Sequence, residues 1–323
     1  TMNTRTRGYL ITILASIAWG FSGVCSEFLM KDYGANPYWL TAIRMLLAAP
    51  TTMGFLLFKD RGFSALHRSL LRNRRSYLPM LIYSVLGLAG SQLTYVVAIG
   101  YSNAGTATVI EFLGPILIVV FVCITARRLP KYTELFAITF ALLGTFILAT
   151  HGKIDSLAIS TDALYWGLAS AIGFALYTLI PIKLIRHYGS ELVVAYGFII
   201  GGIILGLGVR VWSYSIKWDF MSVMAMAGLV LVGTTFAFTL FLQGVGDIGP
   251  VRASLISCLQ PISATFFSFL LVGTHFTLVD IAGMALILAG VIIVSLKDLI
   301  SAKRLDRRSS TATSDEKATS EGK

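Results

Sequence analysis

The chain has 323 residues, of which 56% are hydrophobic and only 13% are charged, and its formal net charge is +10. Because soluble domains carry about 25% charged residues, this composition excludes an ordinary water-soluble enzyme or binding domain. The positive charge is spread along the chain rather than gathered in one patch, which argues against nucleic acid as a partner. Most of the chain is therefore expected to lie in a lipid bilayer.

Apolar runs about as long as the 20 residues that cross a bilayer recur ten times along the chain. We expect transmembrane helices at roughly 8–29, 38–58, 77–100, 103–126, 132–150, 164–183, 192–209, 221–244, 248–272 and 276–297. The connections are short, so no soluble domain fits between them. Residues 1–7 form a short cytoplasmic N-terminus, and 301–323, rich in Ser, Thr, Lys and Glu, are expected to be a disordered cytoplasmic tail. The predicted fold class is an all-α polytopic membrane protein.

Lysine and arginine are divided unevenly between the two sides of the predicted membrane. With the N-terminus in the cytoplasm, twenty of the 26 fall in cytoplasmic segments, and Arg44 and Arg252 fall within spans. The outer loops hold Lys31, Lys153, Arg210 and Lys217. Under the positive-inside rule, both termini are expected to face the cytoplasm. The basic charge is thus an orientation signal, and the lipid bilayer is the expected partner.

The sequence repeats itself at a constant offset of 146 residues. Residues 98–115 match 244–261, and each segment ends in a Leu-x-Pro sequence, at Pro115 and Pro261. Proline removes a backbone donor and interrupts a helix, so each half is expected to contain one broken span. Broken spans at corresponding places of two repeats are typical of secondary transporters.

The two repeats divide the ten spans into halves of five, at 8–150 and 164–297. The first spans of the two halves align loosely at an offset of 155 residues, where Tyr33-Gly34 matches Tyr188-Gly189. Because five is odd, the second half must enter the membrane from the opposite side. Inverted repeats of this kind surround a central site and open it to one side or the other.

These features resemble the drug/metabolite transporter superfamily, and more specifically its ten-helix EamA-like exporters. The resemblance rests on Ala18-Trp19-Gly20, the two Leu-x-Pro helices, and the paired Gly144 and Gly290 of the fifth and tenth spans. Family repeats often place Gly-Glu before their last helix. Here the first half has Arg127-Arg128 and the second has Gly273-Thr274, so any role of that glutamate is not carried over.

The resemblance implies a central cavity lined by spans one, three, four, six, eight and nine, with spans five and ten at the periphery. It further implies export of amino acids, related metabolites or drug-like compounds across the bacterial cytoplasmic (inner) membrane by alternating access. We expect a monomer without a cofactor. Cys25, Cys123 and Cys258 lie in apolar runs without paired spacing, so we expect packing residues and no disulfide or metal site.

Glu111 stands four residues before Pro115, whose ring displaces its carbonyl. It falls near the membrane midplane, where an unpaired carboxylate is costly and is expected to face a partner or a wet cavity. It could bind a substrate ammonium group, carry a proton, or pair with Arg44. We favour substrate contact for Glu111 and an ion-pair gate between Glu27 and Arg44. Equally, Arg44 and Glu111 could hold the two ends of a zwitterionic substrate.

The second half replaces the acid with neutral groups, because Pro261 frees the carbonyl of Ser257 and stands beside Gln260. Aromatic residues with one polar atom lie well inside spans one, three and six, where they suit either a cavity for organic molecules or ordinary helix packing. The predicted substrate-binding set is Trp19, Tyr95, Glu111, Tyr177, Ser257 and Gln260.

Other function classes lack their motifs. The four histidines fall in loops or at span ends, and no Gly-x-Ser-x-Gly, His-Glu-x-x-His or Walker sequence occurs. These absences argue against an enzyme and against an ATP-driven pump. A passive channel or membrane sensor stays an alternative, although the unequal Glu111 and Ser257 disfavour a symmetric polar ring. A proton-coupled multidrug antiporter is the alternative among transporters, with Glu111 as its proton carrier.

Overall fold

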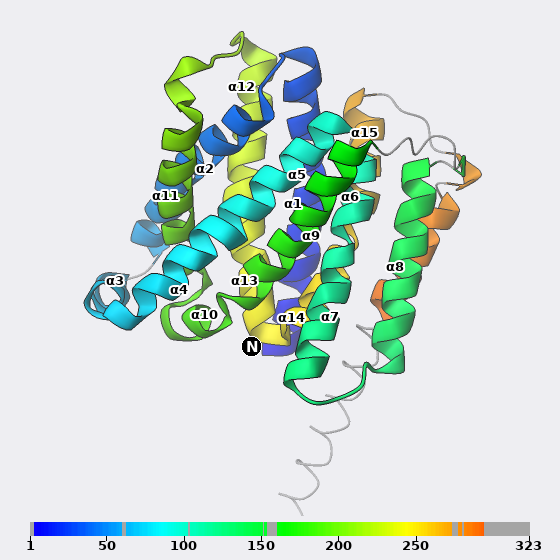
Figure 1. Cartoon of the computed structure of the whole chain (residues 1–323), viewed down its shortest axis with the longest axis horizontal. Helices are drawn as coiled ribbons and strands as arrows, with labels where there is room; N and C mark the ends of the chain where they lie inside the picture. The colour runs from blue at the N-terminus through cyan, green and yellow to red at the C-terminus, as the bar shows by residue number, and fades with distance from the viewer. Residues whose placement is uncertain are drawn as a thin grey trace, which may run out of the picture.

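The computed structural model describes residues 3–59, 63–102, 104–150, 152–153, 160–272, 277–279 and 281–293. These residues are helical apart from short connections (Figure 1). The predicted tail at 301–323 and the Gly273-Thr274 turn lie outside the described residues.

The helices follow one another in two halves. The first half holds α1 (Thr4–Asp32), α2 (Pro37–Lys59), α3 (Phe63–Arg72), the 3-10 turn η1 (Arg74–Ser76), α4 (Tyr77–Ile82), the π-helical turn η2 (Tyr83–Ala89), α5 (Gly90–Tyr101), α6 (Ala104–Glu111), α7 (Leu113–Thr125) and α8 (Tyr132–Thr150). The second half holds α9 (Thr161–Leu179), α10 (Ile182–Tyr188), α11 (Ser190–Val209), the 3-10 turn η4 (Val211–Ser213), α12 (Phe220–Ala227), the π-helical turn η5 (Gly228–Phe236), α13 (Ala237–Ile248), α14 (Pro250–Ser257), α15 (Gln260–Val272) and a last helix, Ile281–Ile293.

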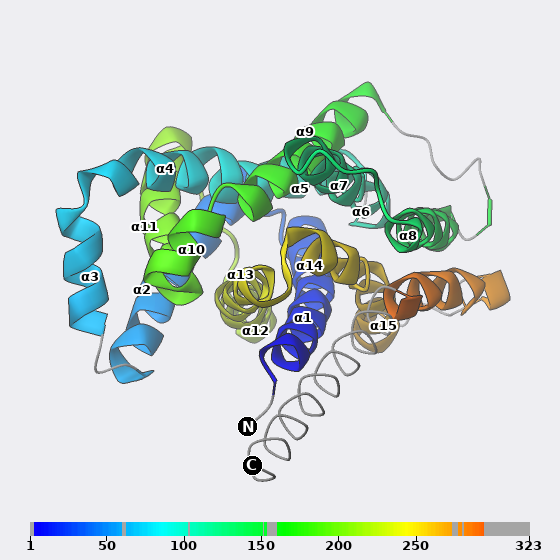
Figure 2. The same ribbon diagram turned by 90° about the horizontal axis from the view of Figure 1, so that it is seen from below.

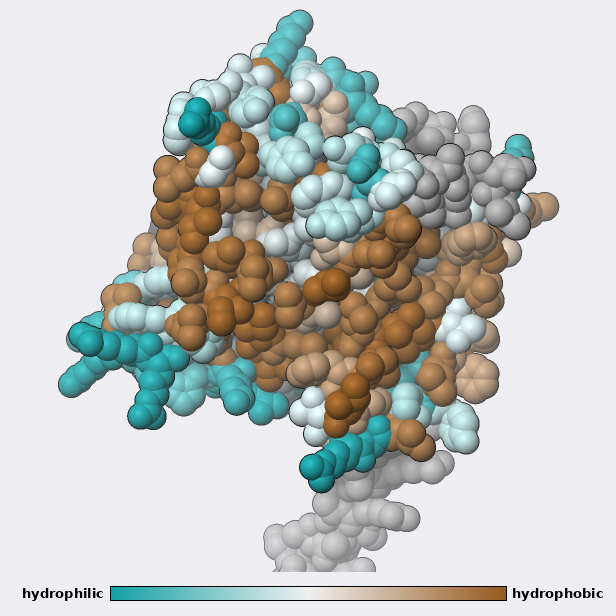
Figure 3. All heavy atoms as spheres, in the orientation of Figure 1, coloured by the Kyte–Doolittle hydropathy of each residue, from teal (hydrophilic) through white to brown (hydrophobic). Residues whose placement is uncertain are grey.

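Eight helical segments of the described chain are long and apolar enough to cross a membrane. Two shorter apolar helices, Tyr132–Ile147 and Ile281–Ile293, fall at the fifth and tenth predicted spans. Consecutive elements join into single spans, so that α12, η5 and α13 form Phe220–Ile248. Apolar side chains cover the middle of the molecular surface and polar ones its two ends (Figure 3). The all-helical membrane fold predicted from composition is thus confirmed.

The two halves share irregularities of the backbone at the offset of 146 residues. In π-helical turns, hydrogen bonds reach five residues instead of four, and such turns occupy Tyr83–Ala89 and Gly228–Phe236. Interruptions follow at Phe112, between α6 and α7, and at Cys258, between α14 and α15. The two halves that the sequence repeats therefore also share their π-helical turns and their helix interruptions.

A left-handed glycine stands in the first turn of each half. Gly34, after α1, has φ +64°, and Gly189, between α10 and α11, has φ +80°. Side chains with a Cβ are strained in this region, whereas glycine adopts it freely. Both positions are the ones that the offset of 155 residues aligns, so the two halves reverse direction by the same means.

Two sets of helices form the centre of the molecule (Figure 2). α1 packs along α13 and α15, and α9 packs along α5 and α7. α1 is joined to the Phe220–Ile248 span at both ends. The Arg7 guanidinium donates to the Asp247 carboxylate at 2.9 and 3.0 Å, and the Tyr33 hydroxyl donates to the Asp219 carboxylate at 2.8 Å.

α8 and the Ile281–Ile293 helix lie side by side at one edge of the molecule (Figure 2). A Cβ added at Gly144 would lie 2.5 Å from the Gly283 carbonyl oxygen, and one at Gly290 would lie 3.0 Å from the Ala137 carbonyl oxygen. Glycine at both positions permits this close approach of two backbones. The paired glycines of the fifth and tenth spans thus leave room for the two helices to pack closely.

Candidate functional site

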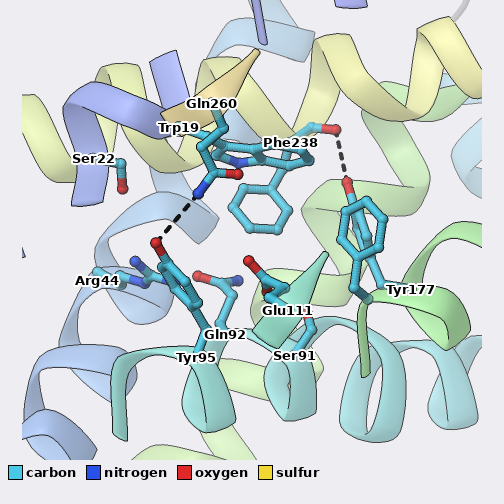
Figure 4. Close-up of a pocket in the computed structure, with 11 residues that line it drawn as sticks. Trp19, Ser22, Arg44, Ser91, Gln92, Tyr95, Glu111, Tyr177, Phe238 and Gln260 are labelled. Carbon is cyan, nitrogen blue, oxygen red and sulfur yellow. Dashed lines mark hydrogen bonds between the residues drawn. The ribbon is translucent and has the colours of Figure 1, made fainter. Parts of the chain in front are cut away.

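A cavity lies at the centre of the molecule, where seven helices meet (Figure 4). Its lining residues are Trp19, Ser22, Arg44, Ser91, Gln92, Tyr95, Glu111, Phe174, Tyr177, Phe238 and Gln260. The centres of water molecules can occupy about 40 Å³ of it. Since drug-sized ligands need roughly 300–1,000 Å³, this conformation admits a few waters, and an organic ligand requires the cavity to widen.

One part of the cavity wall is aromatic. The ring of Trp19 packs edge-on against Phe238, with centroids 5.1 Å apart, and also against Phe174 and Tyr177. The Tyr177 hydroxyl donates to the Phe238 carbonyl at 3.1 Å, which fixes α9 against α13. These rings offer an apolar surface at which only the Trp19 indole N–H and the Tyr177 hydroxyl are polar.

Glu111 ends α6 and projects into the other part of the wall. α6 stops there because Phe112 leaves the helix, three residues before the ring of Pro115. Pro115 itself stands in the first turn of α7, where a missing N–H leaves no hydrogen bond unmade. The buried Glu111 carboxylate accepts a hydrogen bond from the Ser170 hydroxyl at 2.7 Å.

A chain of hydrogen bonds joins the polar wall to the second half. The Tyr95 hydroxyl shares a hydrogen bond of 2.9 Å with the Thr108 hydroxyl, and it accepts one of 3.3 Å from the Gln260 amide (Figure 4). Gln260 is the first residue of α15, directly after the helix interruption at Cys258 and Leu259. Both broken spans therefore bring a polar side chain to the cavity at the point where the helix is interrupted.

Three cavity residues carry buried polar atoms without a hydrogen-bond partner among the described residues: Trp19 Nε1, Arg44 Nε, and both amide atoms of Gln92. Arg44 is only 4% exposed, and it forms no ion pair within the part of the chain that the structure describes. Arg44 and Glu111 both line the cavity (Figure 4). Buried polar groups without partners cost free energy, so these atoms are available to a ligand or to water.

The cavity brings together five of the six predicted substrate-binding residues: Trp19, Tyr95, Glu111, Tyr177 and Gln260. Ser257 is not among its lining residues, and its hydroxyl donates to the Ser254 carbonyl of the same helix at 2.6 Å. Of the predicted gate pair, Arg44 lines the cavity, whereas Glu27 pairs with Lys31 one helical turn on. The structure therefore does not join Glu27 to Arg44.

Other lining residues escaped the sequence reasoning. They are Ser22, Ser91, Gln92, Phe174 and Phe238. For Gln92 a signal existed, because an amide inside an apolar span is expected to face a partner or a wet cavity. For Phe174 the repeat offered a signal, because it stands 155 residues after Trp19, at the matching position of the second half. Phe238 gave none, since a phenylalanine in a transmembrane helix can face lipid as well as protein. Among the described residues, no three metal-ligating side chains come together.

Comparison of the sequence with known proteins finds a family that this chain matches. The sequence pattern of the EamA-like transporter family matches residues 6–150 and 162–296. The uncharacterized inner membrane transporter YicL of Salmonella typhimurium is 40% identical over 296 residues, which cover 91% of this chain and 97% of that protein. An S-adenosylmethionine/S-adenosylhomocysteine transporter of Chlamydia trachomatis is 22% identical over 82% of each chain.

A solved crystal structure has the same fold. It superimposes with a TM-score of 0.76 at 18% sequence identity, covering 93% of this chain and 99% of the other. At that identity the likeness concerns the fold alone. The family pattern matches both halves of the chain separately, as the internal repeat requires.

Proposed function

The chain belongs to the EamA-like transporter family of the drug/metabolite transporter superfamily, and from this premise we infer that it is a secondary transporter that exports small zwitterionic metabolites by alternating access. Amino acids and compounds with an amino-acid end are the substrate class. The observation behind this proposal is that buried Arg44, which forms no ion pair within the described residues, lines the same small cavity as buried Glu111.

Arg44 and Glu111 suit the two ends of a zwitterion. A guanidinium binds a carboxylate through paired hydrogen bonds, and the Nε of Arg44 and the amide of Gln92 have unused hydrogen-bonding capacity there. The Glu111 carboxylate accepts one hydrogen bond, from Ser170, and has further lone pairs for a substrate ammonium group. A bound zwitterion would satisfy both charges at once, whereas an anion or a cation would leave one of them unmatched.

The aromatic wall suits the rest of the substrate. Trp19, Phe174, Tyr177 and Phe238 offer ring faces and edges to an apolar or aromatic substituent. The Chlamydia trachomatis relative transports S-adenosylmethionine and S-adenosylhomocysteine, as its name states. Both compounds join an amino-acid end to an aromatic base, which is the combination that the two walls of this cavity favour.

Alternating access follows from the duplication. The cavity is too small for a metabolite in this conformation, so the surrounding helices must separate to load it. Two halves of like structure and opposite insertion can exchange conformations and open the cavity to either side. The positive-inside rule places both termini in the cytoplasm, and the YicL relative is named an inner membrane transporter. On this basis we propose that the protein works in the bacterial cytoplasmic membrane; that it works there as a monomer is a separate proposal, since one chain already contains both repeats.

Counterflow in proteoliposomes tests this function. Vesicles loaded with an unlabelled zwitterionic amino acid should accumulate the labelled compound transiently, because a carrier exchanges substrate across a single site. The panel of test compounds contains aromatic amino acids, thioether amino acids and S-adenosylhomocysteine. It also contains matched compounds that lack either the ammonium or the carboxylate group. Accumulation of the intact zwitterions alone is the expected result. Transport of the single-charge analogues at equal rates would contradict the zwitterion site, and flux without counterflow would favour a channel.

A further inference from the structure

The helix α3 differs from the membrane spans in its direction. In Figure 1 it is seen nearly end-on beside the lower end of α2, whereas in Figure 2 it is seen lengthwise and α8 is seen end-on. α3 therefore runs across the direction of the spans, at the end of the molecule where the N-terminus lies. A helix with this direction at this end of the spans is expected to lie along the membrane surface.

α3 has an attached face and an exposed face. Leu70 is buried, and His67 packs on Tyr196 of α11, whose hydroxyl lies 3.1 Å from His67 Nδ1. Leu66 and Leu71 are exposed apolar side chains, as are Tyr77 and Leu78 at the start of α4. Exposed leucines beside a membrane span are expected to dip into the acyl-chain boundary of the bilayer.

Positive charge is concentrated on the exposed side. Arg72 ends α3, and Arg74 and Arg75 form the η1 turn directly after it; all three are exposed. None of the three forms an ion pair within the described part of the chain. The sequence contains no aspartate or glutamate between Asp60 and Glu111, so no acidic neighbour in this segment offsets the charge.

The arginine-bearing turn is held rigidly by the second half of the chain. The Asn73 amide donates to the Tyr188 hydroxyl at 2.9 Å, and the Ser76 hydroxyl lies 2.8 Å from the same oxygen. Tyr188 is only 2% exposed, and the Asn73 carboxamide oxygen also accepts from the Arg75 amide. The backbone that carries the three arginines is thus ordered before any ligand arrives, which reduces the entropy cost of binding.

We propose that Arg72, Arg74 and Arg75, presented by the α3–η1 turn, form a binding site for the phosphate groups of anionic membrane lipids. Arginine binds phosphate with paired hydrogen bonds, and basic residues next to a span are attracted to an anionic leaflet. The polar side chains over α3 border the apolar belt of the surface (Figure 3). Lipid phosphates lie at this boundary, and the exposed leucines set the depth of the turn. The inference does not depend on which substrate the cavity binds.

A lipid titration with matched charge variants tests the site. The purified full-length protein in a neutral detergent is titrated with dioleoylphosphatidylglycerol or dioleoylphosphatidylcholine, and bound lipid is counted by native mass spectrometry. The test variant is R72Q/R74Q/R75Q. The control, R5Q/K183Q/R186Q, removes the same charge from three exposed positions at the same end of the molecule. The melting temperature without lipid checks that each variant is folded.

The wild-type protein should bind phosphatidylglycerol in preference to phosphatidylcholine, and the test variant should bind it roughly tenfold or more weakly. The control variant should keep the wild-type affinity. An equal loss in both variants would overturn the proposal in favour of diffuse attraction, and an unchanged affinity in the test variant would overturn it outright. If the test variant does not fold, R72K/R74K/R75K replaces it: a several-fold loss despite the retained charge supports paired phosphate contacts, and no loss contradicts them.

Discussion

Gln92 and Phe238 occupy equivalent positions of the two halves, 146 residues apart, and both line the central cavity. Each stands in the first turn of the α-helix that follows a π-helical turn, Gln92 in α5 and Phe238 in α13. One half thus contributes a buried amide where the other contributes an aromatic ring. The repeat preserves the backbone, and divergence of its side chains makes the cavity polar on one side and aromatic on the other.

Replacing Gln92 with Leu should raise stability and impair transport. Both amide atoms of Gln92 are buried without a partner in the described chain, and an unsatisfied buried polar group costs about 1–3 kcal/mol. An apolar side chain of similar size removes that cost and also removes a ligand contact. The melting temperature of the purified protein and counterflow rates measure the two effects. A lower melting temperature together with normal transport would contradict the assignment.

Replacing Arg44 with Gln should raise the KM for zwitterionic substrates. Hydrogen bonds to charged groups contribute about 1.5–3 kcal/mol, so the increase should be roughly 10- to 100-fold. Arg44→Lys should recover part of the affinity, because it keeps the charge and loses the paired donors. Glu27→Gln is the charge control, since Glu27 pairs with Lys31 away from the cavity. An equal rise of KM in that control would show that Arg44 acts through a gate with Glu27.

Replacing Glu111 with Gln should reduce counterflow by roughly tenfold or more while expression stays normal, because the ammonium contact is lost. Ser257→Ala is the matched control: Ser257 stands at the equivalent position of the second half, and its hydroxyl bonds only within its own helix in the described structure. Transport should also be followed from pH 5.5 to 8.5. If Glu111 carries protons, any pH dependence of the wild type disappears in the variant, and an unchanged pH profile would assign proton coupling elsewhere.

Replacing Gly144 with Ala should destabilise the protein by about 1–3 kcal/mol, because the added methyl group meets the Gly283 carbonyl oxygen at 2.5 Å. Gly208→Ala is the control. An added Cβ there meets nothing within 4 Å, and alanine is the better helix former. Its stability should equal or exceed that of the wild type. Thermal unfolding in detergent compares the two, and equal melting temperatures would contradict the close packing of α8 against the Ile281–Ile293 helix.

Asp219 should contribute stability that disappears in acid. The Ser222 backbone amide and then the Tyr33 hydroxyl donate to its carboxylate and hold its pKa below the ordinary value of 3.8. A lowered folded-state pKa stabilises the fold above the ordinary pKa, and that stability is lost as the pH falls through the folded-state pKa. Asp219→Asn keeps a helix-capping side chain but does not titrate.

The melting temperatures of the wild type and of Asp219→Asn should therefore differ at pH 7 and converge as the pH falls below about 4. Tyr33→Phe should reduce the difference, since it removes one of the donors. A constant difference over the whole pH range would mean that the charge of Asp219 makes no contribution.

Much of the cavity lining was predictable, because a proline inside an apolar run marks the place where a transmembrane helix is broken. Glu111 stands four residues before Pro115, and Gln260 stands directly before Pro261. Proline leaves backbone groups without their helical partners at such breaks, which favours polar side chains there. Trp19, Tyr95 and Tyr177 were found as aromatic residues deep in their spans. The prediction of Ser257 rested on the carbonyl that Pro261 frees, yet the Ser257 hydroxyl bonds to its own helix and is not among the groups that line the cavity.

The partner of Glu27 and the direction of the Gln92 side chain were not predictable in the same way. Glu27 pairs with Lys31, four residues on along the same helix, a local contact that competes with any distant arginine. The direction of Gln92 depends on the rotation of α5 against its neighbours. In a soluble helix an apolar stripe would reveal that rotation, but a transmembrane helix is apolar toward both lipid and protein, so the stripe is faint.

Sequence alone determined the ten apolar segments, their grouping into two repeats and the places where spans break, because a bilayer imposes a fixed apolar length and demands that each backbone group find its partner locally. Only the tertiary structure decided which face of each helix turns inward. That choice brought Arg44, which has no ion pair among the residues that the structure describes, to the same cavity as Glu111, and it packed four aromatic rings around Trp19. Helix rotation is settled by side-chain packing between segments far apart in the chain, and no local pattern encodes it.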